Sequence, residues 1–85
     1  MFNVFLGLRA QKFIRNAEKE LRMRLWEKID MLKINPFPQE AIRVEGKKGK
    51  AFRVRVGSYR IQYYVFHEKN EILIFDIDKR DRAYD

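Results

Sequence analysis

The chain has 85 residues, too few for two hydrophobic cores, so we expect a single domain over residues 1–85. Hydrophobic residues make up 46% and aromatic residues 14%, which is enough apolar surface to fold although 36% of the residues are charged. The net charge of +7 favours a polyanionic partner, and the lack of cysteine excludes disulfides, thiolate metal sites and a cysteine nucleophile. Without a signal peptide or a bilayer-length apolar run, a cytoplasmic protein with no membrane partner is expected.

The first half of the chain is predicted to form a short strand and two helices. Phe2–Leu6 is apolar and aromatic, as in a strand, whereas Leu8–Ile34 lacks proline and glycine and is rich in helix-forming residues. A break between two antiparallel helices is expected near Asn16, and the prolines at 36 and 38 end the second helix. One face of that helix carries an apolar stripe of Leu21, Leu25, Ile29 and Leu32.

Met23 and Trp26 lie beside this stripe. We expect them at the margin of the core. The alternative is an exposed apolar patch that the helix of a partner protein covers.

The second half is predicted to be β-structure. Residues 52–56 and 59–65 alternate between apolar and polar around Gly57-Ser58, which indicates a hairpin with a two-residue turn. Ile72–Ile77 is apolar at nearly every position, so we place it in mid-sheet. The predicted fold is α+β, with an N-terminal strand and a two-helix hairpin packed on one face of a mainly antiparallel sheet of four or five strands.

Three arginines share one face of the predicted hairpin. With Gly57-Ser58 as the turn, Arg55 lies opposite Arg60, and Arg53 lies on the same face. Like charges directly opposite each other destabilise a ladder by up to about 1 kcal/mol. The arginines are therefore either solvated or neutralised by Asp76 and Asp78, or they hold a phosphodiester through bidentate contacts.

The end of the chain adds cations and an aromatic ring at Lys79, Arg80, Arg82 and Tyr84. This segment is either an ordinary charged tail, or it places a cation and a stacking aromatic ring beside one nucleotide.

Two further features have plain interpretations. Lys47, Lys48 and Lys50 lie among glycines without the spacing of a phosphate-binding loop, so a basic RNA-facing turn is expected. His67 is the only histidine and lies in a predicted loop, so a His-His ribonuclease pair is excluded and a surface position is expected.

Taken in order, these motifs resemble the RelE/ParE toxin superfamily. The run from Phe52 to Tyr63, the isoleucine-rich strand and the segment Lys79–Tyr84 follow its pattern, and so does the helical hairpin that ends in Asn35-Pro36-Phe37-Pro38. The resemblance implies a RelE-like fold and the toxin of a type II toxin-antitoxin system. It further implies a metal-independent endoribonuclease, without a cofactor, that cleaves mRNA on the ribosome. The expected protein partner is a cognate RelB-like antitoxin, with which the toxin could form a heterotetramer.

The resemblance also implies roles for single residues. In such enzymes the ribose 2′-hydroxyl attacks the adjacent phosphate, and basic groups stabilise the added negative charge. The matching catalytic residues are Arg53, Arg55, Arg60, Arg80 and Tyr84. The residues expected to bind RNA are Lys47, Lys48, Lys50, Lys79 and Arg82. No metal ligand is expected.

Related toxins often have lysine where this chain has Arg53 and Arg55, and arginine cannot act as a general base. Proton abstraction then falls to Tyr84 or Lys79, each of which needs strong perturbation to act at neutral pH. We therefore expect charge stabilisation and substrate orientation to dominate, with slow cleavage of free RNA.

Two alternative functions remain. One is a ParE-like toxin that inhibits DNA gyrase without cutting nucleic acid, since one fold can host both activities. The other is a non-toxic RNA- or DNA-binding module. The complete set of four arginines and a tyrosine favours the ribonuclease.

Overall fold

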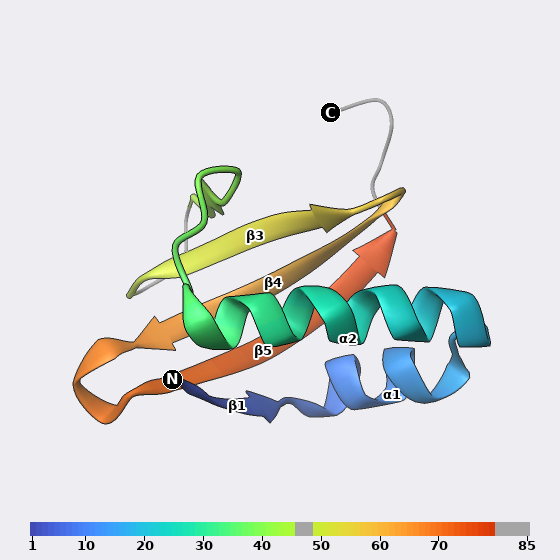
Figure 1. Ribbon diagram of the computed structural model, residues 1–85, viewed down its shortest axis with the longest axis horizontal. Coiled ribbons are helices and arrows are strands. Elements are labelled where there is room, and N and C mark those ends of the chain that lie inside the picture. The colour runs from blue at the N-terminus through green and yellow to red at the C-terminus, as the bar shows by residue number, and fades with distance from the viewer. Residues whose placement is uncertain (46–48, 80–85) are drawn as a thin grey trace.

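The computed structural model describes residues 1–45 and 49–79 as two helices packed on a five-stranded sheet (Figure 1). The elements in chain order are β1 (Asn3–Leu6), α1 (Leu8–Asn16), α2 (Lys19–Ile34), β2 (Ile42–Arg43), β3 (Ala51–Val56), β4 (Tyr59–Phe66), a 3-10 turn η1 (His67–Lys69) and β5 (Glu71–Lys79). The strand order is β1-β5-β4-β3-β2, with β1 parallel to β5 and the other pairs antiparallel. The predicted α+β architecture is confirmed.

The two helices form the predicted hairpin and cover one face of the sheet (Figure 1). The chain leaves the helical conformation at Ala17 and Glu18, where the backbone is extended, one residue after the expected break. After α2, the side-chain oxygen of Asn35 accepts a hydrogen bond from the amide of Phe37 at 3.1 Å, which stabilises the turn through the two prolines. No helix among the described residues is long and apolar enough to cross a membrane.

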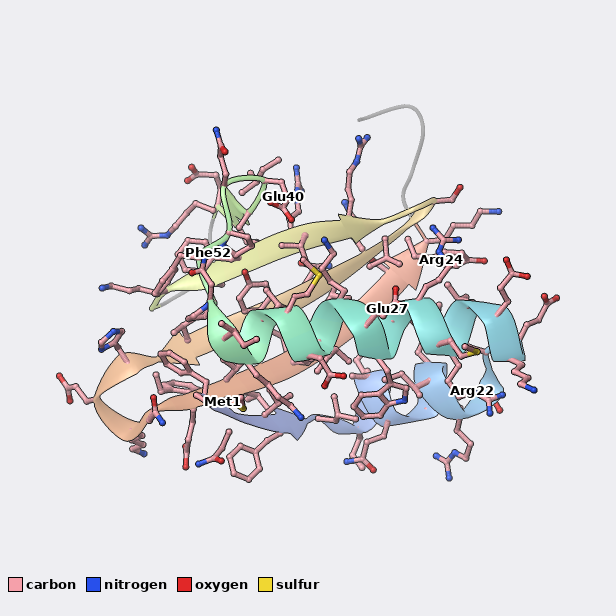
Figure 2. The ribbon with its side chains drawn as sticks, viewed as in Figure 1. Met1, Arg22, Arg24, Glu27, Glu40 and Phe52 are labelled. Atoms are coloured by element: carbon pink, nitrogen blue, oxygen red, sulfur yellow. The ribbon has the colours of Figure 1, made fainter. Side chains whose placement is uncertain are left out.

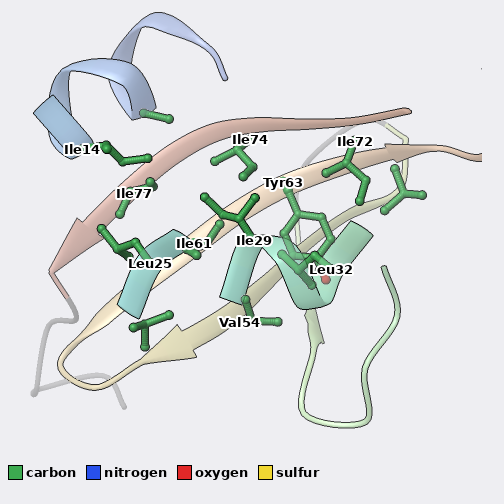
Figure 3. Close-up of a cluster of buried hydrophobic side chains, with 13 residues drawn as sticks. Ile14, Leu25, Ile29, Leu32, Val54, Ile61, Tyr63, Ile72, Ile74 and Ile77 are labelled. Atoms are coloured by element: carbon green, nitrogen blue, oxygen red, sulfur yellow. The ribbon is translucent and has the colours of Figure 1, made fainter. Parts of the chain in front are cut away.

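The core lies between the helices and the sheet (Figure 3). The predicted stripe of α2 supplies Leu25, Ile29 and Leu32, which are fully buried, and Leu21 packs against them at the margin. The sheet contributes residues at every second position of β3 and β4, as the period of two requires.

The expectation for Met23 and Trp26 is wrong. Met23 is 60% exposed and Trp26 is 39% exposed, and neither is among the residues that pack against the core cluster. A helix buries only the stripe that faces the sheet, and no described element packs on the opposite side of α2.

A buried hydrogen bond fixes the end of α2 against the middle of the sheet. The hydroxyl of Tyr63, in β4, donates to the carbonyl oxygen of Pro36 at 2.8 Å. Burial raises the pKa of Tyr63 well above its ordinary value. The phenol therefore stays protonated and keeps donating across the neutral range.

The hairpin register is as predicted, whereas two other details of the sheet, an edge strand and a register shift, were not predicted. Gly57 has φ = 60°, a left-handed value that suits glycine in a tight hairpin turn. Residues Ile42–Arg43 form a short edge strand that was not predicted as a separate element. A register shift lies between Gln62, which pairs with Asp76, and Tyr63, which pairs with Ile74, so β5 contains one extra residue at Phe75.

Candidate nucleic-acid interface

The sheet face opposite the helices carries the predicted arginines. We call it the open face, because no helix among the described residues packs on it (Figure 1). Arg53 pairs with Gln62, and Arg55 pairs with Arg60, so these side chains lie on the face opposite the buried Val54 and Ile61. The structure thus brings three of the five predicted catalytic residues together.

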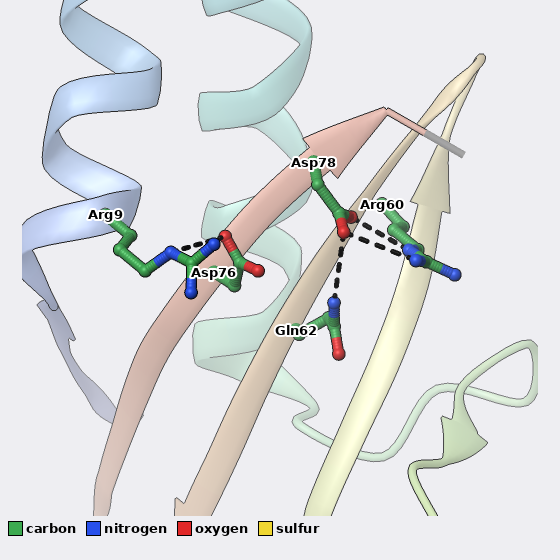
Figure 4. A network of polar contacts seen from close by, with 5 residues as sticks. All are labelled: Arg9, Arg60, Gln62, Asp76 and Asp78. Carbon is green, nitrogen blue, oxygen red and sulfur yellow. Dashed lines mark hydrogen bonds and ion pairs between the residues drawn. The ribbon is translucent and has the colours of Figure 1, made fainter. Parts of the chain in front are cut away.

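Asp78 neutralises Arg60 from the neighbouring strand. Nε of Arg60 donates to Oδ1 of Asp78 at 2.8 Å, and Nη2 donates to Oδ2 at 3.3 Å (Figure 4). Gln62 adds a long contact of 3.5 Å from Nε2 to the same carboxylate. The carboxylate offsets the repulsion between Arg60 and Arg55 and holds the Arg60 guanidinium in place. Of the two acids expected to do this, Asp78 does so.

The register shift between Gln62 and Tyr63, a β-bulge in β5, brings the Asp78 carboxylate to the open face. In β5, Ile72 and Ile74 point to the core, and in a regular strand the next side chain to face the core would be that of residue 76. The extra residue changes the phase, so Ile77 is buried and Asp78 faces Arg60 on the open face. The isoleucine spacing changes from two to three residues at this point, which is the signal in the sequence that could have revealed the bulge.

Arg53 and Arg55 differ from Arg60. Within residues 1–45 and 49–79, neither side chain forms a hydrogen bond or an ion pair. Arg55 is exposed and Arg53 is half-buried. Their charge is therefore not balanced by a neighbouring carboxylate in the described part of the chain. An anion that binds them has to displace water and does not have to displace a carboxylate of these residues.

An aromatic cluster that the sequence reasoning missed continues the open face away from the hairpin turn. The ring centroids of Tyr64 and Phe75 are 4.7 Å apart, and those of Tyr64 and Phe66 are 6.1 Å apart. Tyr64 follows Arg60 and Gln62 at every second position of β4, so the alternation already placed it on the arginine side.

The predicted RNA-binding lysines do not join the arginine cluster as far as they are described. Lys50 precedes β3 at the end remote from the hairpin turn. Lys79 pairs with Tyr59, whose ring contacts Phe13 of α1 on the helix side of the sheet. The remaining predicted residues, Arg80, Tyr84, Lys47, Lys48 and Arg82, lie outside the described residues.

A cleft of about 950 Å³ lies between the helical hairpin and the ends of β4 and β5. Its rim includes Arg24, which extends from α2 toward the strand ends (Figure 2). Asp76 also lines the cleft and has a weak ion pair with Arg9, with 3.7 Å between Oδ1 and Nε. The rim carries both cations and carboxylates, so it has no clear preference for an anion. Among the described residues, no three His, Cys, Asp or Glu side chains are grouped to hold a metal ion.

Comparison with known proteins agrees with this architecture. The model of the family "ParE toxin of type II toxin-antitoxin system" matches residues 8–84. A Methanocaldococcus jannaschii protein named "Putative toxin RelE1" is 34% identical, over 98% of this chain and 94% of the relative.

Solved structures show the same fold. The archaeal RelE-RelB complex from Pyrococcus horikoshii OT3 contains a chain that superposes with a TM-score of 0.84 at 29% identity, covering 96% of this chain and 98% of that one. A chain of the E. coli RelBE toxin-antitoxin complex superposes with a TM-score of 0.82 at 24% identity, covering 96% of this chain and 100% of that one. This second match shows a likeness of fold. Because the toxin family model matches nearly the whole sequence, the chain belongs to the RelE/ParE superfamily of type II toxin-antitoxin toxins.

Proposed function

We propose that this toxin is an endoribonuclease that cleaves mRNA. The observation that carries the proposal is the cluster of Arg53, Arg55 and Arg60 on the open face, where Arg53 and Arg55 have no protein partner among the described residues. Guanidinium groups keep their charge at any physiological pH and bind phosphate oxygens through paired N–H donors. A gyrase inhibitor has no need of such a cluster.

The proposed reaction needs no metal, because arginines supply the positive charge. The 2′-oxygen attacks the adjacent phosphorus and forms a P–O2′ bond while the P–O5′ bond breaks. The products are a 2′,3′-cyclic phosphate and a 5′-hydroxyl. One proton leaves the 2′-hydroxyl and one is delivered to the departing O5′. Arg53 and Arg55 stabilise the extra negative charge on the phosphorane-like transition state, and Arg60, held by Asp78, orients the phosphate.

The proton acceptor in this proposal is Tyr84. Arginine cannot accept the proton, and Lys79 follows Asp78 in the strand, so its side chain leaves on the opposite side from Arg60. Arg80 completes the set of cations. Because a tyrosine hydroxyl is a weak base at neutral pH, we propose that alignment by the ribosome supplies much of the rate, so that naked RNA is cut slowly.

The proposed protein partner is a cognate RelB-like antitoxin. The solved relatives from Pyrococcus horikoshii and E. coli were determined as complexes of RelE with RelB. This chain shares their fold over nearly its whole length, which supports the same kind of partner. We propose that the two proteins assemble as a toxin-antitoxin heterotetramer.

The test is inducible expression followed by mapping of new 5′ ends in cellular mRNA. Arg53→Ala, Arg60→Ala, Arg80→Ala and Tyr84→Ala are expected to abolish site-specific ends. The matched control is Arg15→Ala, which removes an exposed cation from the last turn of α1, in the helix layer. Growth arrest with DNA damage and intact messages would instead identify a gyrase inhibitor. In vitro, equal rates on naked and ribosome-bound message would refute the role of the ribosome.

A further inference from the structure

Arg24 of α2 lies against the turn of the β3–β4 hairpin. A Cβ atom added at Gly57 would be 2.6 Å from Nη2 of Arg24, 3.3 Å from Cζ and 3.4 Å from Nη1, so the guanidinium packs on the backbone of the turn. Glycine leaves room for this approach, because a Cβ at this position would displace the guanidinium. Figure 2 shows Arg24 extending from α2 toward the ends of the strands.

The charge of Arg24 is exposed and is not neutralised in the described part of the chain. Glu20 precedes it by one helical turn, a spacing at which an acid and an arginine pair along a helix. Arg24 nevertheless forms no ion pair or hydrogen bond within residues 1–45 and 49–79. The two aspartates that line the cleft are engaged with Arg9 and Arg60. Although the rim as a whole carries both signs, its end at the hairpin turn presents a cation.

Arg24 adds a further arginine to a turn that already carries two. Arg55 lies just before Gly57 and Arg60 just after it, and both leave the hairpin on the open face. Arg24 reaches the same turn from the helix layer. Like charges brought together around one turn repel each other, and a local conflict with folding often marks a functional site.

We propose that Arg24 binds a phosphate of single-stranded RNA next to the scissile phosphate, at the mouth of the cleft. The proposal rests on the ribonuclease function. The scissile phosphate lies on the open face at Arg53 and Arg55, and the strand passes round the Gly57 turn to Arg24. There the flanking nucleotide enters the cleft, whose volume of about 950 Å³ lies within the range of roughly 300–1,000 Å³ for ligand sites.

A polynucleotide fits this arrangement better than an acidic protein segment. Its phosphates recur at every residue of the strand, so RNA bound at the open face brings the next anion to the turn through its own backbone. A guanidinium binds phosphate oxygens through paired N–H donors, and the packing of Arg24 on the turn restricts its motion before RNA binds. The net charge of +7 acts in the same direction.

Titration of a labelled single-stranded RNA tests this contact. The full chain is added to a fluorescein-labelled oligonucleotide whose 2′-hydroxyls are methylated to prevent cleavage, and anisotropy gives the affinity at several salt concentrations. Arg24→Ala is expected to reduce the slope of log affinity against log salt by about 0.7, the value for one phosphate contact on a single strand. At a salt concentration of about 0.1 M this corresponds to roughly fivefold weaker binding.

Arg22→Ala is the matched control. It removes the same charge from the same helix, but Arg22 leaves α2 on the side away from Arg24, where its Nη2 donates to the carbonyl oxygen of Ala17 at 2.8 Å (Figure 2). Its salt slope is expected to equal that of the wild type. Arg24→Lys keeps the charge and the slope but binds more weakly than the wild type, because it loses the paired donors. Thermal unfolding verifies that each variant is folded.

The outcomes separate this inference from the proposed function. Equal salt slopes in Arg24→Ala and Arg22→Ala overturn the Arg24 contact, whereas new mRNA ends made by the wild type leave the ribonuclease standing. A wild type that makes no new ends but binds RNA through Arg24 refutes the ribonuclease and supports the RNA contact. Loss of binding to labelled polyglutamate in Arg24→Ala, with unchanged RNA affinity, assigns Arg24 to an acidic protein partner and overturns the inference. If the wild type neither cuts nor binds RNA, both proposals fail.

Discussion

Replacing Asp78 by asparagine tests whether this carboxylate makes the arginine cluster compatible with folding. Hydrogen bonds to charged groups contribute about 1.5–3 kcal/mol when shielded, and exposed ion pairs about 0–1 kcal/mol. The side chains of Arg60 and Asp78 are 24% and 34% exposed, between these limits. Asp78→Asn also leaves the repulsion between Arg55 and Arg60 without its counter-charge. We therefore expect a loss of about 1–2 kcal/mol, which lowers the Tm of a domain of this size by roughly 4–16 °C.

A double-mutant cycle isolates the electrostatic part. Chemical unfolding followed by circular dichroism gives the free energy of unfolding for Asp78→Asn, for Arg55→Ala and for both together. In the Arg55→Ala background, Asp78→Asn should cost about 0.5–1 kcal/mol less, because one source of repulsion is gone. Asp76→Asn is the matched control, since its ion pair with the exposed Arg9 spans 3.7 Å; it should cost less than about 0.5 kcal/mol. Equal costs in both backgrounds would refute the role assigned to Asp78.

Three further substitutions test the fold. Tyr63→Phe removes the hydrogen bond to Pro36, and the unsatisfied carbonyl should cost about 1–3 kcal/mol of unfolding free energy. The pKa of Tyr63 is raised in the folded state, so the contribution of this residue to the free energy of unfolding is complete below the ordinary pKa of 10.0 and declines as the pH rises above that value. Urea unfolding at pH values on both sides of 10.0 should show a decline in the free energy of unfolding that is smaller in Tyr63→Phe. Ile29→Ala, at a fully buried position, should cost about 2–5 kcal/mol by denaturant unfolding, against less than about 0.5 kcal/mol for Met31→Ala, which is 57% exposed. Gly57→Ala places a Cβ at φ = 60° and should lower stability by about 1–2 kcal/mol; an unchanged Tm would mean that the turn has a different backbone in solution.

Local features of the fold were predictable from the sequence. The turn at Gly57-Ser58 and the period of two determine which residues face each other across β3 and β4, because both signals lie within one short stretch of chain. The stripe of α2 likewise follows from the helical period. The edge strand Ile42–Arg43 was missed, because two residues carry no period and their pairing depends on a distant partner.

The candidate site also has features that the sequence alone determined and features that only the tertiary structure decided. By itself the sequence determined that Arg53, Arg55 and Arg60 share one sheet face, since alternation along a strand is a local property. Only the tertiary structure decided that Asp78 reaches Arg60 and that Phe75 meets Tyr64, because these contacts depend on how β5 is aligned with β4. That alignment changes at the bulge, where one extra residue reverses which side chains face the core. Cross-strand register is fixed by packing over the whole sheet, and that packing joins residues far apart in the chain.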